Sequence, residues 1–194
     1  FGTKNNAFFK CNPENLNIQI GGENSNLSNS HGNDSSGYYN YYDLESDYGW
    51  SQLYDLIDTL NNNSDSAYKL LNIDRALWMH AFNYSLINYD SYIGYGQNYY
   101  LYKQPSLEFS PILWDMNMSF GGFRLTDASQ LYFNGFNISQ AQNMDPFIHY
   151  YTPFISPRPL IEKLFQSPRN RKMFMAHIRT CLLYTSPSPR DVEE

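Results

Sequence analysis

The sequence predicts an α+β fold in which helices pack around a β-hairpin. Apolar residues between positions 50 and 60 recur at the spacing of one helix face. Two aromatic and apolar segments, 98–102 and 107–113, flank a turn at Gln104-Pro105-Ser106, as the strands of a hairpin do. A chain of 194 residues can bury one sizeable core, so we expect a single domain.

The segments before residue 50 predict strands and a loop. Residues 1–10 predict a strand, in which Ala7-Phe8-Phe9 leads into Lys10 and Asn12-Pro13 ends the pattern. Residues 16–20 alternate between apolar and polar, which predicts a second strand that ends at two glycines. Residues 23–37 are rich in Asn, Ser and Gly and predict a mobile surface loop.

Four helices are expected further along the chain. The first ends near residue 62, and its apolar face comprises Trp50, Leu53, Tyr54, Ile57 and Leu60. The second follows an N-cap at Asp74, and its predicted buried stripe comprises Leu77, Trp78, Ala81, Phe82, Ser85 and Leu86. Residues 123–151 predict irregular structure. Two further helices begin at Pro159 and Pro168, and the last is expected to bury Phe174, His177 and Ile178.

Composition argues against two classes of protein. The formal net charge is −6, whereas nucleic-acid binding needs clustered Lys and Arg, so we expect no nucleic-acid partner. No apolar run approaches the length of a membrane span, and none is expected in this fragment. Because the sequence begins at Phe1 and the natural start is expected to be missing, the lack of a signal segment says nothing about export.

The end of the chain has an unusual sequence. Residues 181–191 resemble the translation of a sequencing adapter, so we expect the domain to comprise residues 1–180 and residues 181–194 to form a non-native, disordered tail. Without Cys181, Cys11 would be the one remaining cysteine, which leaves no basis for a disulfide or a cysteine metal site.

Two aspartates and an asparagine suggest a chemistry. Asp90 follows the second predicted helix, Asp115 follows the second strand of the hairpin, and Asn98 lies between them. The hairpin can fold the two aspartates toward each other. Phosphoryl transfer uses a carboxylate near the attacking hydroxyl and oxygen ligands that hold divalent ions against the phosphates.

The segments around these residues resemble the CotH kinase family. The similar central segments are 88–92, 98–102 and 114–121; segments 1–4 and 8–10 upstream, and 158–165 and 168–169 downstream, are also similar. The resemblance implies the C-terminal-lobe part of an atypical protein-kinase-like fold, with the N-terminal nucleotide-binding part truncated. It further implies ATP with Mg²⁺ or Mn²⁺, phosphate transfer to hydroxyl groups of a spore-coat or surface protein, and an extracellular, cell-envelope or spore-coat location.

Residue by residue, the resemblance implies roles for three positions. Asp90 matches the catalytic-loop aspartate, and Asp115 matches the metal-binding aspartate that corresponds in role to the DFG aspartate of ordinary kinases. Asn98 matches the metal-binding asparagine of the catalytic loop, if the Gly94-Tyr95-Gly96 insertion loops out to absorb the longer spacing.

Two further positions carry weaker expectations. The family commonly has Trp-Asp-x-Asp, whereas this chain has Asn117 at the last position; an amide oxygen can bind a hard cation, but one negative charge is lost. Lys10 is the candidate lysine for contacting phosphate, and an ordinary solvent-facing lysine is the alternative.

Two other function classes stay open on the sequence alone. A pseudokinase or structural surface protein would keep the fold without turnover. A carbohydrate-active enzyme would use Asp90 and Asp115 as an acid and base pair, which the many aromatic residues would permit. None of the four histidines has a spacing typical of a metal ligand or a catalytic triad.

Overall fold

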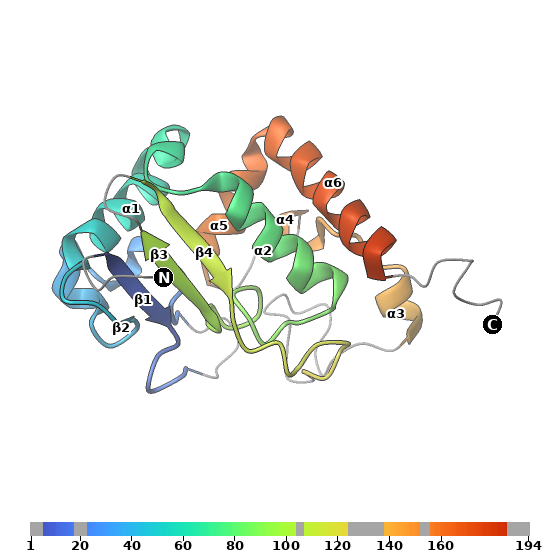
Figure 1. Cartoon of the computed structure of the whole chain (residues 1–194), viewed down its shortest axis with the longest axis horizontal. Coiled ribbons are helices and arrows are strands. Elements are labelled where there is room, and N and C mark those ends of the chain that lie inside the picture. Colours follow the sequence, from blue (N-terminus) through green and yellow to red (C-terminus); the bar gives the residue numbers. More distant parts are fainter. Residues whose placement is uncertain (1–5, 18–22, 104–106, 124–137, 152–155, 186–194) are drawn as a thin grey trace.

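A computed structural model of the chain describes residues 6–17, 23–103, 107–123, 138–151 and 156–185. Figure 1 shows a sheet at one end of the molecule and the helices α2 and α6 side by side toward the other. The strands are β1 (Ala7–Cys11), β2 (Asp43–Leu44), β3 (Tyr99–Lys103) and β4 (Phe109–Leu113). The helices are α1 (Trp50–Asn62), α2 (Ile73–Ser85), α3 (Ile138–Gln142), α4 (Ile148–Tyr151), α5 (Pro159–Glu162) and α6 (Pro168–Thr185).

The four strands form one antiparallel sheet in the order β2-β1-β3-β4. The predicted strand before Asn12 and the predicted hairpin are both confirmed within the described residues. In β1, Ala7, Phe9 and Cys11 are buried while Phe8 and Lys10 are partly exposed, the alternation expected for a sheet with one face on the core. Helix α1 covers the buried face.

The first predicted helix is confirmed as α1. Leu53, Leu56, Ile57 and Leu60 are completely buried, and the Trp50 ring packs edge-on against Phe9 with 5.1 Å between ring centroids. The apolar face that the sequence predicted is therefore what attaches this helix to the sheet.

The second predicted helix exists as α2, but its predicted start is wrong. The N-cap is Asn72, whose side chain accepts a hydrogen bond from the backbone N–H of Arg75. Asp74 lies in the first turn instead, and its carboxylate is 2.8 Å from His177 Nε2 on α6. Asp74 thus links two helices.

The predicted buried stripe of α2 is wrong in part. Phe82 is 37% exposed, while Met79, His80, Asn83 and Tyr84 are buried. The helix lies between β4 and α6, so it needs two buried sides, and a search for one apolar stripe cannot find polar residues that face a second neighbour.

Residues 23–37 are not the mobile surface loop that the sequence predicted. Residues 24–28 are buried, and short 3₁₀ helices follow at Asn29–His31 and Ser35–Tyr38. The Asn24 amide donates to the Tyr95 carbonyl (2.7 Å) and the Asn26 amide to the Pro157 carbonyl (3.0 Å). Asparagine side chains can form hydrogen bonds with buried backbone groups. A segment rich in asparagine is therefore not necessarily exposed to solvent.

The closing helices are confirmed, with one difference at the end of the chain. Helix α5 begins at Pro159, and α6 begins at Pro168 and buries Phe174 and Ile178, whereas His177, also predicted to be buried, is partly exposed. Residues 181–185 are helical where a disordered tail was expected, and Cys181 is buried. Both cysteines are free thiols.

Two other predictions concern segments that the structure describes only in part. The strand expected at residues 16–20 falls mostly in 18–22, outside them, and the described Leu16 and Asn17 are not in a strand. Residues 123–151 are less irregular than predicted, because α3 and α4 lie there, while residues 124–137 are outside the described part. Among the described residues, no helix combines the length and hydrophobicity needed to cross a bilayer.

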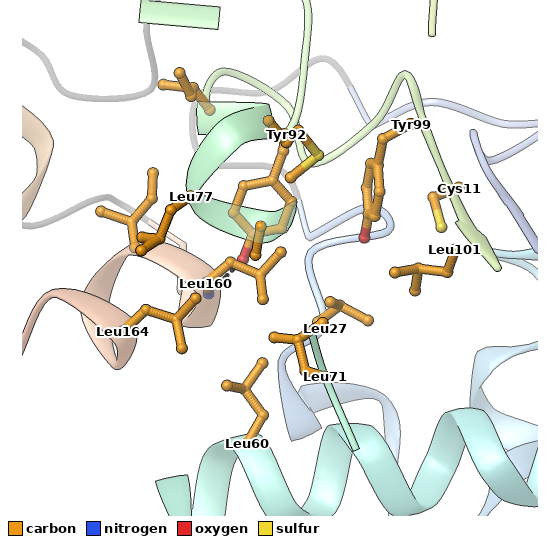
Figure 2. Packing of buried hydrophobic residues seen from close by; sticks show 14 of the residues in the cluster. Cys11, Leu27, Leu60, Leu71, Leu77, Tyr92, Tyr99, Leu101, Leu160 and Leu164 are labelled. Atoms are coloured by element: carbon orange, nitrogen blue, oxygen red, sulfur yellow. Dashed lines mark hydrogen bonds between the residues drawn. The ribbon is translucent and has the colours of Figure 1, made fainter. Parts of the chain in front are cut away.

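The core joins the sheet to the helices through aromatic side chains. Figure 2 shows Tyr92 and Tyr99 packed among leucines from several parts of the chain, including Leu27, Leu77 and Leu160. The Tyr92 hydroxyl accepts a hydrogen bond from the Leu160 backbone N–H at 3.0 Å. These two tyrosines belong to the segment between α2 and β3, so the core also fixes the residues around Asp90.

Candidate active site

The segment that carries Asp90 begins at a sharp helix end. At the end of α2, the Ile87 N–H donates to the Tyr84 carbonyl and the Asn88 N–H to the Asn83 carbonyl (2.8 Å), the pattern of a Schellman motif. This motif places one residue in the left-handed region, and here it is Ile87 (φ +50°) rather than glycine. The chain thereby turns directly into residues 88–98, which we call the Asp90 loop.

Arg158, in the C-terminal part of the chain, forms hydrogen bonds that hold the Asp90 loop in place. This arginine is completely buried, and its guanidinium donates to the carbonyls of Ile93 (3.2 Å) and Gly94 (2.7 Å) and to the Ser156 hydroxyl. Burial lowers the pKa of Arg158 to about 10. A charged guanidinium inside the protein needs acceptors, and the loop carbonyls provide them.

The buried segment 24–28 holds the same loop from another side. The Tyr92 hydroxyl donates to the Asn26 carbonyl at 2.8 Å, in addition to the Asn24 contact with Tyr95. The Gly94-Tyr95-Gly96 insertion therefore does not loop out as predicted but packs inward. Gly96 has φ +63°, and a Cβ there would lie 3.0 Å from the Asn26 Cβ, so glycine fits this position on both counts.

Asp115 lies just beyond the end of β4, in a turn that folds back toward α2. The N–H groups of Phe120 and Gly121 donate to the carbonyls of Leu86 (2.6 Å) and Ile87 (3.1 Å). These bonds join the turn after Asp115 to the residues that directly precede the Asp90 loop. Asp115 itself has φ +52°, a conformation that few non-glycine residues adopt.

The fold brings Asp90 and Asp115 close enough to interact electrostatically. Both side chains are half-buried. Burial raises the pKa of Asp90 above its usual range, hydrogen-bond donation from Gln97 opposes this, and the negative charge of Asp115 raises it further. A carboxylate whose charge is destabilised by burial and by a neighbouring negative charge is a setting in which a bound cation is favourable.

Asn98 contacts Asp90, and Asn117 lies in the turn that follows Asp115. The Asn98 amide nitrogen donates to the Asp90 carbonyl oxygen at 2.9 Å, and Asn98 has φ +59°. Its side-chain oxygen is the group that could bind a cation. Asn117 is exposed in the turn two residues after Asp115.

Lys10 is the most distant of the predicted site residues in sequence, yet it lies near the same turn. Its ammonium group is 4.6 Å from the ring centroid of Trp114, the residue directly before Asp115. Lys10 pairs with Tyr100 across β1 and β3, and Tyr100 packs edge-on against Trp114. The sheet register therefore places a positive charge next to the end of β4.

The family described as CotH kinase protein matches residues 1–184. The chain belongs to the CotH kinase family. Curated proteins give no match to the chain. Membership in the CotH kinase family indicates a kinase, that is, a phosphotransferase, and kinases in general use ATP with a divalent metal.

The residues of this CotH kinase chain fit a divalent cation only with the help of amides. Within the described ranges, no three His, Cys, Asp or Glu side chains gather into a group that could hold a metal. The predicted metal set has one carboxylate, from Asp115, and amide oxygens from Asn98 and Asn117, with the carboxylate of the predicted catalytic residue Asp90 nearby. Oxygen donors of this kind suit Mg²⁺, which keeps several waters and often takes only one or two carboxylates from the protein.

Several residues that build the site were not predicted from the sequence. Gln97 donates from Nε2 to Asp90 Oδ1 at 2.5 Å, Arg158 holds the Asp90 loop, and Asn24 and Asn26 support it. The sequence offered one signal, an arginine between Pro157 and Pro159 in a segment similar to the CotH kinase family. Gln97 and the two asparagines have no such signal, because their roles depend on contacts between distant segments.

Proposed function

We propose that the chain is an ATP- and metal-dependent protein kinase whose site is built around Asp90 and Asp115. The observation that carries the proposal is that the negative charge of Asp115 acts on the Asp90 carboxylate, where the end of α2 meets the end of β4, in a chain that belongs to the CotH kinase family. The turn after Asp115 is hydrogen-bonded to the end of α2, so the two aspartates are held on one side of the fold.

In this proposal each predicted residue has a distinct task. Asp115, with Asn98 and Asn117, would hold Mg²⁺ or Mn²⁺, which neutralises charge on the phosphates of ATP. Lys10 would contact a phosphate oxygen. Asp90 would take the proton from the acceptor hydroxyl. The hydroxyl oxygen would then bond to the γ-phosphorus of ATP as the bond between this phosphorus and the ADP oxygen breaks.

The proposed substrate is a hydroxyl group of a spore-coat or cell-surface protein, and the proposed location is extracellular, in the cell envelope or in the spore coat. Family resemblance is the support for both. Fractionation of the source cells with an antibody against the chain tests the location, and detection in the cytosolic fraction alone would contradict it.

The binding half of the proposal is tested by thermal stabilisation. ATP with Mg²⁺ or Mn²⁺ should raise the melting temperature of the full chain, because a ligand that binds the native state stabilises it. Asp115→Ala should abolish this rise, whereas Asp55→Ala, an exposed aspartate on α1, should retain it. A rise with oligosaccharide but not with nucleotide would support a carbohydrate-active enzyme instead.

The transfer half is tested by phosphorylation of a protein acceptor. Asp90→Asn keeps the size of the side chain but removes the base, so transfer should fall by roughly 10²- to 10⁴-fold while ATP-dependent stabilisation persists. Equal transfer by wild type and the Asp90 variant would exclude the proposed role. Binding of nucleotide without any transfer by wild type would identify a pseudokinase.

A further inference from the structure

Gln97 contacts the proposed catalytic group directly. Its Nε2 lies 2.5 Å from Asp90 Oδ1, and the Gln97 side chain is 6% exposed. A neutral amide can donate one hydrogen bond to a carboxylate without cancelling its charge, whereas an arginine or lysine at this distance would pair with it as an ion. The contact occupies one carboxylate oxygen and limits rotation of the Asp90 side chain.

The next residue fixes the backbone of Asp90 in the same way. Asn98 Nδ2 donates to the Asp90 carbonyl oxygen at 2.9 Å. Consecutive residues at the end of the Asp90 loop therefore hold the side chain and the main chain of one aspartate. Such a double contact defines the orientation of the carboxylate and not only its position.

Gln97 is itself held by contacts from distant segments. Gly96 turns the chain in the left-handed region against Asn26, and the Gln97 N–H reaches the Ser91 carbonyl at 3.4 Å. Arg158 fixes the loop at the two residues that directly precede Tyr95, through the carbonyls of Ile93 and Gly94. The amide is thus presented to Asp90 from a rigid support, as a positioning residue requires.

We propose that Gln97 is a positioning residue that holds one oxygen of the Asp90 carboxylate and thereby turns the other toward the acceptor hydroxyl. The inference rests on the proposed function, in which Asp90 accepts the hydroxyl proton. A base that is displaced by about 1 Å can lose roughly 100-fold in rate, so removal of the amide should act on kcat. It should leave KM for ATP unchanged, because Gln97 does not belong to the proposed nucleotide-binding set.

The test uses two variants of similar size that lack the amide. Gln97→Met preserves volume and packing, and Gln97→Glu preserves shape but places a second carboxyl against Asp90, where the two groups must share a proton. Both should lower kcat for protein phosphorylation by about 100-fold, with KM for ATP and the thermal shift with ATP and Mg²⁺ as in wild type. Gln166→Met, at an exposed glutamine, should match wild type in all three measurements.

Two kinetic results would overturn the inference. If Gln97→Met keeps kcat within about twofold of wild type, the amide only fills space. If its kcat falls together with the nucleotide thermal shift, Gln97 acts on the nucleotide site and not on Asp90.

Crystal structures of wild type and Gln97→Met separate this inference from the proposed function. The Asp90 carboxylate should rotate in the variant, and an unchanged carboxylate would overturn the positioning role. If wild type transfers no phosphate but the carboxylate rotates, the kinase proposal fails while the contact retains its positioning effect on Asp90.

Discussion

Protonation of His80 should couple the stability of this fold to pH. His80 lies on α2, is completely buried, and neither ring nitrogen has a hydrogen-bond partner among the described residues. Its closest aromatic neighbours are Tyr92 of the Asp90 loop and Phe165, with ring centroids 5.6 and 6.1 Å away. Burial lowers the pKa of His80 to about 4; the nearby backbone of Leu160 opposes this without reaching hydrogen-bond geometry.

The direction and size of the effect follow from this value. In the unfolded chain His80 has an ordinary pKa near 6.5, so between pH 6.5 and 4 the unfolded state binds more protons than the native state. The contribution of His80 is therefore fully present above pH 6.5 and is lost as pH falls toward 4. At about 1.4 kcal/mol per unit, the loss over this window approaches roughly 3 kcal/mol.

Urea unfolding at several pH values between 4 and 7.5 measures this loss, provided that the transition is two-state. His80→Leu should remove the His80 part of the pH slope, while Met79→Leu, a volume-conserving change at the next position, should keep the wild-type slope. The comparison of slopes separates His80 from other titrating groups. Identical slopes for wild type and His80→Leu would refute the reasoning, whatever their stabilities at pH 7.

Three further predictions concern the residues around the site. Gly96→Ala should lower the free energy of unfolding by about 1–3 kcal/mol, and by more than Gly121→Ala does. Both glycines have positive φ, but only at Gly96 would the added Cβ also meet a neighbouring backbone. Urea unfolding of the two variants checks which one loses more stability. Arg158→Met should lower the free energy of unfolding by about 2–4 kcal/mol in the same assay, because it leaves buried carbonyls without a hydrogen-bond donor. A loss no larger than that of Arg75→Met, at an exposed arginine, would contradict this prediction. Asn117→Asp should lower the Mg²⁺ concentration for half-maximal stabilisation in the presence of ATP by about tenfold, and an unchanged titration would remove Asn117 from the cation set.

The elements with regular periodicity were predictable from the sequence. Helix α1 and the β3-β4 hairpin could be predicted because the apolar residues that each one buries recur at a regular spacing in the sequence. The two aspartates could also be proposed as site residues from the sequence, since each follows such an element. Resemblance to a family then supplied roles that spacing alone could not supply.

The supports of the site were not predictable, for a physical reason. Asn24 and Asn26 have the composition of a loop, and their burial depends on carbonyls more than 70 and more than 130 residues away along the chain. Buried polar residues satisfy partners that only the finished fold brings near, so no local pattern announces them. Gln97 and Arg158 were missed for the same reason, and the N-cap of α2 was misplaced because Asn72 and Asp74 are both good capping residues.

Backbone strain gives an independent argument that this junction serves a purpose beyond packing. Five described non-glycine residues have positive φ, and four of them, Ile87, Asn98, Asp115 and Phe120, lie in the segments that meet around Asp90; the fifth is Leu27. Left-handed conformations at such residues cost about 1–3 kcal/mol each and persist only where the surroundings enforce them. A helix end and a hairpin end could join with glycine at these positions at a lower cost. Two of these strained positions, Asn98 and Asp115, are predicted site residues, which is the pattern expected when the geometry of a site, and not stability alone, has determined the sequence.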